Sequence, residues 1–519
     1  MTIKKGQIIL PTGTGKTQIM IATLIEDMVE KTKNGQVGTY VVAAHRILLC
    51  RQLLERILKE ADACGLNFDI LSIGSDKLDG DTDVYKDWIS RDALNCNILS
   101  TTQSQDIGDF LNQAKSKNRH AIIASTYHSL WSLLRYAMEN PIDIMLCDEA
   151  HTTTQKRFNS CLKDFVQQNA TKSVYYFTAT PRVKGIDKKP SFGGGGMHNI
   201  EVYGPRLCEK SLREMVDQME IVRPKFHYIE YNKNSSSPMT LSKAIEYAFL
   251  WHRNKVKARA KSGSDKLGLT TPETMGAKKL VSCNGISQLK EIFHNPVFQQ
   301  FCKDKNVKVC AYSSQGCGYG DSTGFIFNTP RKEVYNKMVN FSEIEDAILL
   351  HVNILTEGID IPSITAVMPL RVLETISLLQ TCGRAARLCK NDRKRLYDPA
   401  TRPDDYKKLI KPAYNIVFLK NILDLESESM KRLILDLMDA YKMSYEEMLE
   451  EEGFWGDTPE APESITPNFF NFSSGKSIQP EQFKQWEEEV KLRRMKEMFT
   501  DYVETRGLPT ALKEITGEN

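Results

Sequence analysis

Residues 10–18 read LPTGTGKTQ, a glycine-rich turn that ends in a lysine and a threonine. Gly13 and Gly15 would let backbone N–H groups approach phosphate oxygens, because no side chain stands in the way, and a following helix would add its positive end. Lys16 would reach the outer phosphates, and Thr17 would offer its hydroxyl to Mg²⁺. The alternative is a glycine turn that happens to precede a lysine. The order strand, loop, lysine and helix favours the phosphate site, although leucine replaces the first glycine of the usual pattern.

A second group of chemically capable residues follows the apolar run IMLC at 144–147. Asp148 would bind Mg²⁺ through water, and Glu149 would polarise a water molecule that attacks a phosphate. An isolated acidic pair is usually a solvated part of a loop. Here the pair begins the sequence DEAH directly after an apolar strand, so we interpret it as the acidic half of a nucleotide site.

The sequence QTCGRAAR at 380–387 carries two arginines, Arg384 and Arg387. Residues three apart lie on the same side of a helix, so we expect both guanidinium groups on one helix face. Each has a permanent charge in a rigid fork, which suits it to stabilise charge that develops during phosphoryl transfer. For an isolated sequence of this kind, a basic surface helix would be the better interpretation.

These groups must be positioned by regular elements, and the first half of the chain alternates short apolar runs with helical patterns. The helix after the glycine turn is expected to bury one face, formed by Ile19, Met20, Leu24, Ile25 and Met28. Strands are expected at 7–10, 39–44, 121–126, 143–149 and 173–180. Such alternation predicts a parallel sheet covered on both faces, with ligands at the carboxyl ends of its strands.

A second alternating series follows, with strands expected at 278–284, 307–313, 346–353, 364–370 and 414–419. The polar, turn-rich stretch YNKNSSSP at 231–238 indicates a connection. We therefore predict an α/β protein with two tandem parallel-sheet domains at 1–205 and 239–420, joined by a linker at 206–238. From 421 to 519 the pattern is charged and helical in period, which predicts an α-helical C-terminal extension.

The chain has 519 residues, of which 41% are hydrophobic and 26% charged, as in ordinary globular domains. A net charge of +3 neither requires nor excludes a nucleic-acid partner, so any basic surface must be local. The twelve cysteines include no C-x-x-C pair, which argues against a zinc ribbon. No apolar run approaches the roughly 20 residues of a membrane span, and no secretory leader is recognisable. We therefore expect a cytoplasmic or nuclear protein without a membrane partner.

The order of the motifs along the chain carries a resemblance to a known family. LPTGTGKT, DEAH, TAT at 178–180, LTEGIDIP at 355–362 and QTCGRAAR follow the order typical of superfamily 2 helicases and translocases. Within that superfamily the chain resembles the branch of type III restriction-enzyme motor subunits and related DNA-dependent helicases. The resemblance runs from residue 7 to about residue 420. It implies two RecA-like domains that bind ATP and Mg²⁺ in the cleft between them.

The resemblance also implies roles for individual residues. ATP would be bound by Thr12, Gly13, Thr14, Gly15, Lys16, Thr17, Gly358 and Asp360, and the metal ion by Thr17 and Asp148. Catalytic groups would be Glu149, Gln380, Arg384 and Arg387. Hydrolysis would be coupled to movement through His151, Thr178 and Thr180. The nucleic-acid strand would be contacted by His45, Arg46, Ser125, Thr126 and Thr356.

The expected function is therefore an ATP-dependent helicase or translocase, with DNA favoured over RNA as the track. The alternative is a nucleic-acid-binding switch or scaffold with weak ATPase activity. Related proteins carry a segment before the phosphate loop that reads the adenine, whereas nine residues precede the loop here. We therefore expect either that the chain is a fragment or late-start product, or that its adenine pocket is missing. Residues 421–519 could bind a protein partner. Tyr127 and Trp131 could stack on a base, but we expect Trp131 in the buried core.

Overall fold

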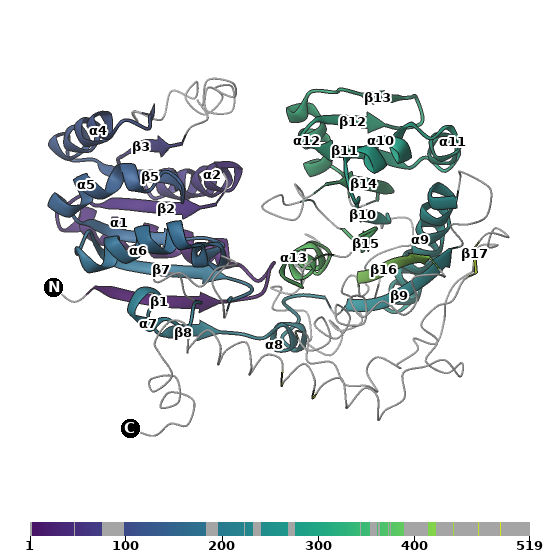
Figure 1. Ribbon diagram of the computed structural model, residues 1–519, viewed down its shortest axis with the longest axis horizontal. Coiled ribbons are helices and arrows are strands. Elements are labelled where there is room, and N and C mark those ends of the chain that lie inside the picture. The colour runs from purple at the N-terminus through teal and green to yellow at the C-terminus, as the bar shows by residue number, and fades with distance from the viewer. Residues whose placement is uncertain are drawn as a thin grey trace. The chain divides into compact units, whose positions relative to one another are not determined.

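The computed structural model describes residues 3–45, 47–74, 98–182, 196–222, 224–231, 240–267, 276–342, 344–352, 361, 364–371, 373, 375–388, 414–421, 440, 465–466, 488 and 492. Its described parts form two compact units, whose main boundary lies between Lys210 and Ser211. Each unit is built around one sheet (Figure 1). None of the helices in the described ranges is long and apolar enough to cross a membrane.

The sheet of the first unit has eight strands in the order β4-β3-β5-β2-β6-β7-β1-β8, and every pairing is parallel. The strands are β1 (Lys4–Ile9), β2 (Thr39–Ala44), β3 (Phe68–Ile73), β4 (Ile98–Ser100), β5 (His120–Thr126), β6 (Ile142–Cys147), β7 (Thr171–Thr178) and β8 (Arg206–Glu209). The central strands are buried at nearly every position, because helices cover both faces of a parallel sheet and leave neither face to water.

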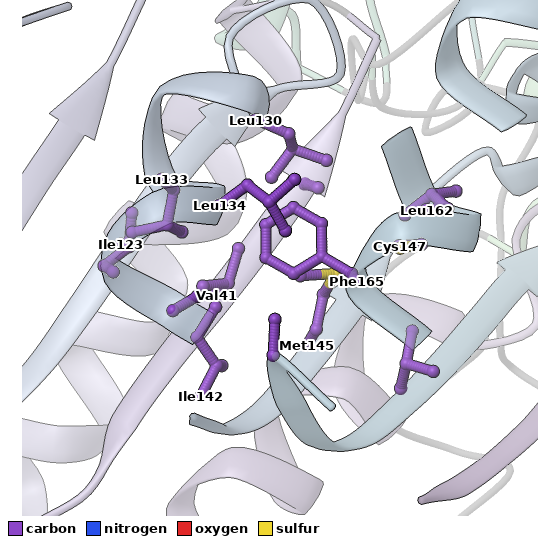
Figure 2. Close-up of a cluster of buried hydrophobic side chains, with 14 of the residues drawn as sticks. Val41, Ile123, Leu130, Leu133, Leu134, Ile142, Met145, Cys147, Leu162 and Phe165 are labelled. Atoms are coloured by element: carbon purple, nitrogen blue, oxygen red, sulfur yellow. The ribbon is translucent and has the colours of Figure 1, made fainter. Parts of the chain in front are cut away.

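Two groups of helices cover the two faces of this sheet. One face is covered by α1 (Lys16–Lys33) and α2 (Ile47–Ala63). The other is covered by α4 (Ser104–Ser116), α5 (Trp131–Glu139) and α6 (Lys156–Gln167). Figure 2 shows how Leu133, Leu134 and Phe165 from these helices meet Val41 and Met145 from the strands. Burial of side chains of this size contributes about 1.5–3 kcal/mol each and fixes the strands that carry the polar edge.

Parallel register brings the carboxyl ends of five strands to one edge. Ala43 pairs with Ser125 on one side and with Cys147 on the other. Cys147 pairs with Tyr176, and Thr178 pairs with Ile9. The loops that follow β1, β2, β5, β6 and β7 therefore start at the same edge, where ligands bind in sheets of this kind.

The sheet of the second unit has nine strands in the order β13-β12-β11-β14-β10-β15-β16-β9-β17. They are β9 (Pro224–Tyr231), β10 (Lys278–Ser282), β11 (Lys308–Ser313), β12 (Gly316–Gly320), β13 (Phe325–Phe327), β14 (Ala347–His351), β15 (Ala366–Pro369), β16 (Tyr414–Asn421) and β17 (Ile465–Thr466). The described helices of this unit are α8 (Leu212–Asp217), α9 (Thr240–Leu267), α10 (Ile286–His294), α11 (Pro296–Asp304), α12 (Arg331–Val339) and α13 (Thr375–Ala385). Helices α9, α10 and α11 share one apolar core with the sheet.

The second sheet is parallel at its centre, as expected, and antiparallel at its edges. Strands β12, β13 and β17 pair antiparallel to their neighbours and lie at the two edges, whereas the strands between them are parallel. The short sequence between β11 and β12 allows a tight reversal, which only antiparallel strands can use. The predicted strands of both units are present, with ends that coincide or are shifted by up to three residues.

Several local expectations were wrong. Residues 206–238, expected to be a linker, contain β8, α8 and β9, and β8 pairs with β1 while β9 pairs with β16. Ile19 was expected on the buried face of α1 but is 41% exposed, and Ile21 is buried instead. Trp131 was expected in the core but is 38% exposed at the start of α5, whereas Tyr127 is fully buried. The C-terminal region 421–519 lies almost entirely outside the described residues.

Candidate active site

The glycine turn lies between β1 and α1, where the sequence predicts it. Gly13 and Gly15 have φ angles of 92° and 91°, in the left-handed region that glycine adopts at little cost. Gly15 is the N-cap of α1, and no side chain caps that end of the helix. A Cβ atom on Gly15 would meet no heavy atom within 4 Å, so space is open beside the turn. A helix N-terminus with open space before it suits an anion such as a phosphate group.

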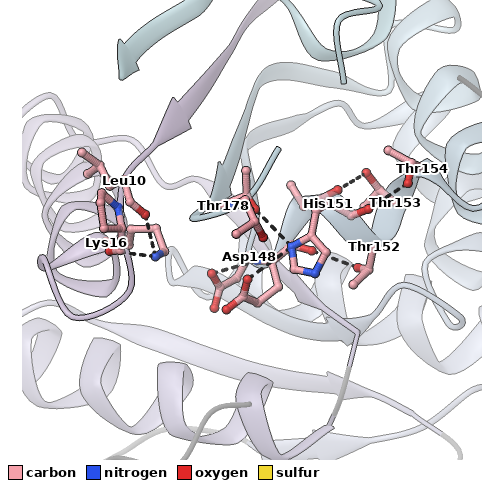
Figure 3. Close-up of polar contacts among 12 residues, drawn as sticks. Leu10, Lys16, Asp148, His151, Thr152, Thr153, Thr154 and Thr178 are labelled. Atoms are coloured by element: carbon pink, nitrogen blue, oxygen red, sulfur yellow. Dashed lines mark hydrogen bonds and ion pairs between the residues drawn. The ribbon is translucent and has the colours of Figure 1, made fainter. Parts of the chain in front are cut away.

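Lys16 begins α1 and is held against the turn itself. Its Nζ donates hydrogen bonds to the carbonyl oxygens of Leu10 at 2.9 Å and Pro11 at 3.2 Å (Figure 3). The residue is 9% exposed, so its ammonium group lies among polar atoms of the loop with little contact with water. Leu10 is anchored in turn, because its N–H donates to the carbonyl of Thr178 at 3.0 Å. Hydrogen bonds therefore connect the lysine to the loop and the loop to β7.

The acidic pair follows β6 at the same edge. The N–H of Asp148 donates to the carbonyl of Ala43 at 2.8 Å, which places the residue directly beside the end of β2. Burial, and next the neighbouring Glu149 carboxylate, raise the pKa of Asp148, whereas the Lys16 ammonium acts in the opposite direction. The end of β6 and the end of β1, which leads into the turn of Lys16, lie at the same edge of the sheet on either side of β7. A bound divalent cation would favour the charged carboxylate.

Glu149 has an unusual backbone. Its φ and ψ are 48° and 47°, a left-handed conformation that costs a non-glycine residue about 1–2 kcal/mol. Its N–H donates to the Oδ1 atom of Asp148 at 2.9 Å, so the first acid holds the second in place. Backbone strain of this kind is concentrated at functional sites, where the surrounding structure enforces it.

His151 joins the acidic pair to β7. It lies in a short 3₁₀ helix at Ala150–Thr154, and its Nδ1 atom is 3.1 Å from Thr178 Oγ1 and 3.4 Å from Glu149 Oε2 (Figure 3). A carboxylate oxygen can only accept, so this arrangement favours the tautomer with the proton on Nδ1. Thr178 Oγ1 also accepts a hydrogen bond from the N–H of Thr180 at 3.2 Å. The three residues expected to act in coupling are thus linked by contacts.

The expected strand-contacting residues divide into accessible and buried groups. Ser125 is 1% exposed, and its hydroxyl donates to the carbonyl of Thr126 at 3.0 Å, so its side chain faces the interior. Thr126 is half-buried and shares a hydrogen bond of 3.1 Å with Ser129. His45 is half-buried at the end of β2. Arg46 and Thr356 lie outside the described residues, as do the expected ATP ligands Gly358 and Asp360.

The residues present fit a nucleotide with Mg²⁺. Within the described ranges, no three His, Cys, Asp or Glu side chains cluster as a metal cage. Mg²⁺ is commonly bound by one or two carboxylates together with phosphate oxygens and water, so a single carboxylate beside a phosphate loop is sufficient. Asp148 provides that carboxylate, and Thr17, half-buried in the first turn of α1, can add its hydroxyl.

The arginines of the second unit are not arranged as expected. Gln380 and Arg384 lie on α13 and are 4% and 6% exposed. Arg387 lies beyond the end of that helix and forms an antiparallel bridge with Ile221. The expectation that Arg384 and Arg387 share one helix face was therefore wrong. The chain leaves the helix at Ala386, whose carbonyl accepts from the N–H of Val222 at 2.7 Å, and this contact ends the helical pattern.

A polar group near these arginines was not identified from the sequence. His351, at the end of β14, has its Nε2 atom 2.7 Å from Ser282 Oγ, at the end of β10. Burial lowers the pKa of His351 to about 3, and the charges of Arg371 and Arg384 act in the same direction. Its place at the end of the apolar run AILLH was the available signal, because polar residues that end buried parallel strands reach the ligand edge.

Tyr127 is the second residue whose place in the site the sequence did not reveal. Its side chain is fully buried, and its hydroxyl donates to the carbonyl of Asp148 at 2.6 Å. The sequence offered one weak signal, since a tyrosine between two polar residues after a strand must either be exposed or find a partner for its hydroxyl.

The architecture defines an α/β protein with the RecA-like helicase fold. Residues 2–183 match the model of the family described as Type III restriction enzyme, res subunit. No curated protein has a significantly similar sequence.

Solved structures are similar to the chain in fold. The ATP-dependent Type ISP restriction-modification enzyme LlaBIII bound to DNA matches with a TM-score of 0.54 and 16% identity, over 84% of this chain and 28% of that chain. A nuclease-deletion mutant of the Type ISP enzyme LlaGI in complex with a DNA substrate mimic gives a TM-score of 0.46 and 15% identity, over 84% and 27% of the two chains. S. cerevisiae Dbp5 bound to RNA and ADP BeF3 matches with a TM-score of 0.46 and 14% identity, over 84% of this chain and 83% of that chain. The chain thus spans less than a third of each restriction-modification enzyme.

Proposed function

We propose that the protein is an ATP-dependent nucleic-acid helicase or translocase, which couples ATP hydrolysis to movement along a strand. One observation carries the proposal: parallel pairing brings the end of β1, which leads into the glycine turn of Lys16, and the end of β6, which Asp148 follows, to the same edge of one sheet. Two glycines with positive φ and an uncapped helix N-terminus complete a place for phosphate groups. The match of residues 2–183 to a restriction-enzyme motor family supports the same activity.

Each residue of the proposed site has a task that follows from its chemistry. Bound Mg²⁺ would neutralise phosphate charge. Lys16 exchanges its loop carbonyl partners for phosphate oxygens, and Asp148 and Thr17 hold the metal ion. Glu149 orients and polarises the attacking water, because its backbone N–H is held by Asp148 Oδ1 and its carboxylate lies 3.4 Å from His151 Nδ1. Gln380, Arg384 and Arg387 act from the second unit on charge that develops during transfer.

We further propose where the strand and the partners bind. Thr126 and His45 at the edge of the first sheet, with Arg46 and Thr356, contact the strand through its phosphates. DNA is favoured over RNA, since the chain matches the restriction-enzyme family and LlaBIII is a structure bound to DNA. Residues 1–205 and 239–420 would be the two motor domains, as in the DEAH-type and type III branch, and 421–519 would bind a protein partner.

Steady-state ATP hydrolysis tests the proposal directly. The purified chain is assayed alone and with single-stranded DNA, duplex DNA and RNA. Lys16→Ala should abolish hydrolysis, whereas Lys115→Ala, which removes an exposed lysine of α4, should not change it. Strong stimulation by one polymer supports a motor and identifies its track. If no polymer stimulates hydrolysis, the motor is contradicted and a binding switch or scaffold with weak ATPase activity explains the site better.

A further inference from the structure

The segment after β5 follows the sheet edge but directs one side chain inward. Thr126 is half-buried and His128 is exposed, whereas Tyr127 between them is 0% exposed. Its ring lies 5.8 Å from the ring of Phe158 on α6. A buried phenol needs a hydrogen-bond partner, and the partner that Tyr127 uses lies in the acidic pair.

The hydroxyl of Tyr127 donates to the carbonyl oxygen of Asp148 at 2.6 Å. That carbonyl belongs to the same peptide group as the N–H of Glu149, which donates to Asp148 Oδ1 at 2.9 Å. The peptide group between the two acids is therefore held at both ends. Any rotation of this group would move the Glu149 carboxylate relative to the phosphate loop.

The held peptide group leads into a strained residue. Glu149 has φ 48° and ψ 47°, a conformation that side-chain-bearing residues adopt at an energetic cost. Such a residue relaxes unless its neighbours fix it. Tyr127 supplies one of these constraints from the end of β5, and His151, 3.4 Å from the Glu149 carboxylate, supplies another.

The other side of Tyr127 faces the proposed strand contacts. Its own N–H donates to the carbonyl of Ala44 at 3.0 Å, directly before His45. The Sγ atom of Cys50 donates to the carbonyl of Ser125 at 3.2 Å. The residues around Tyr127 are thus fixed to β2 and α2 by their main chain. Because Thr126 directly precedes Tyr127 in the chain, a displacement of Thr126 would also move the tyrosine.

We propose that Tyr127 is a positioning residue that couples strand binding at Thr126 and His45 to the orientation of the peptide group between Asp148 and Glu149. This inference rests on the proposed function, because it requires that both a nucleotide and a strand bind to the first unit. The site of contact with the nucleic-acid strand and the acidic pair are then connected by one hydrogen bond, from the Tyr127 hydroxyl to the carbonyl of Asp148. The coupling is reciprocal, so nucleotide binding must change strand affinity by the same factor as the reverse.

The competing explanation is a core tyrosine whose hydroxyl only satisfies its nearest carbonyl. The chain offers a matched control in Tyr176 on β7, which is also 0% exposed. Within the described part of the chain its hydroxyl has no hydrogen-bond partner, and its ring packs against Tyr203 at 4.9 Å. Tyr176→Phe removes the same atom from the same sheet without touching the acidic pair.

The test measures binding rather than turnover. The affinity of a fluorescently labelled single-stranded DNA oligonucleotide is measured by anisotropy, with and without Mg²⁺ and a non-hydrolysable ATP analogue. The ratio of the two dissociation constants is the coupling factor. Tyr127→Phe should reduce this factor about three- to tenfold, the range for loss of one hydrogen bond. Affinity for oligonucleotide alone and for analogue alone should stay near the wild-type values, and Tyr176→Phe should keep the wild-type factor.

A second variant protects the result against a folding defect. 4-Aminophenylalanine in place of Tyr127 keeps a donor at the same place, so it should restore the coupling factor that Tyr127→Phe loses. An unchanged factor in Tyr127→Phe, or an equal loss in Tyr176→Phe, overturns the inference. If the wild-type protein itself shows no effect of the analogue on oligonucleotide affinity, the proposed function fails and the inference fails with it. Failure of the inference and failure of the proposed function can be distinguished, because failure of the proposed function is observed in the wild-type protein, before any substitution is made.

Discussion

The carboxyl edges of the two sheets each contain a histidine bonded to a hydroxyl, but the charges around them have opposite signs. In the first unit His151 Nδ1 lies 3.1 Å from Thr178 Oγ1 and 3.4 Å from Glu149 Oε2. A histidine next to a carboxylate is favoured as a proton donor. Here the pair joins an acidic loop to the strand beside the phosphate turn.

In the second unit His351 Nε2 lies 2.7 Å from Ser282 Oγ, among arginines. Burial and then the charges of Arg371 and Arg384 lower the pKa of His351 to about 3, so the ring is neutral at physiological pH. The same pair of a histidine and a hydroxyl is therefore found beside a carboxylate in one sheet and beside arginines in the other. The first edge suits a metal ion and an attacking water, and the second suits an anion.

The largest effect is expected from the charge of the first edge. Glu149→Gln should lower kcat at least about a hundredfold, because an amide cannot polarise the attacking water, while nucleotide affinity stays within a few-fold of wild type. Steady-state hydrolysis and equilibrium binding of a fluorescent ATP analogue measure the two effects. Glu139→Gln, on an exposed acid at the end of α5, is the matched control. Hydrolysis at the wild-type rate in Glu149→Gln would show that this edge does not activate water.

The second edge is tested by removing its buried cation. Arg384→Ala should lower kcat about a hundredfold, the usual effect of losing one group that stabilises the transition state. Arg135→Ala removes an exposed arginine of α5 and should leave kcat unchanged. Comparison of kcat in saturating ATP measures the difference. An equal, small effect of both substitutions would contradict the assignment of opposite roles to the two edges.

The two hydroxyls allow a direct comparison of the histidine pairs. Thr178→Val keeps the shape of the side chain but removes the partner of His151 and of the Thr180 N–H, so nucleic-acid-stimulated kcat should fall about tenfold. Ser282→Ala removes the partner of His351, whose ring is neutral, so kcat should change only about two- to threefold. If Ser282→Ala has the larger effect, the second pair is the one that controls turnover.

The smallest effect concerns acid stability, and the amino end of the first sheet supplies it. The Gly38 N–H donates to His120 Nδ1 at 3.0 Å, and His120 Nε2 lies 2.8 Å from Thr32 Oγ1, so the folded protein needs the neutral ring. Burial first lowers the pKa of His120 to about 4. Below about pH 6.5, the ordinary pKa of histidine, the unfolded chain binds a proton at His120, whereas the folded chain does not bind it until the pH approaches 4.

Stability should therefore be constant well above pH 6.5 from this source and fall as the pH decreases towards 4, by about 1.5 kcal/mol between pH 6.5 and 5. Urea unfolding at several pH values measures the slope. His120→Gln should reduce the slope in this window, because no proton is bound at the site in either state. The lowered pKa of His351 makes stability depend on pH in the same direction, and this contribution remains in His120→Gln. An identical slope in His120→Gln would contradict the assignment.

Elements with strong local signals could be predicted from the sequence. Apolar runs predicted the strands β2 and β5 to within one residue, and the glycine turn was predicted between a strand and a helix, because hydrophobic period and glycine content are local properties. The place of Asp148 and Glu149 after β6 follows for the same reason. The fold class also follows, since strands that alternate with helices form parallel sheets covered on both faces.

Tertiary structure alone decided how side chains at the two edges are used. Arg387 leaves the helix of Arg384 because a bridge to Ile221, remote in sequence, competes with the helical period. The hydroxyl of Tyr127 reaches Asp148 only because parallel register places β5 and β6 on either side of β2. Local sequence specifies backbone conformation and burial pattern, whereas the hydrogen-bond partner of a buried group depends on segments that meet only in the folded chain.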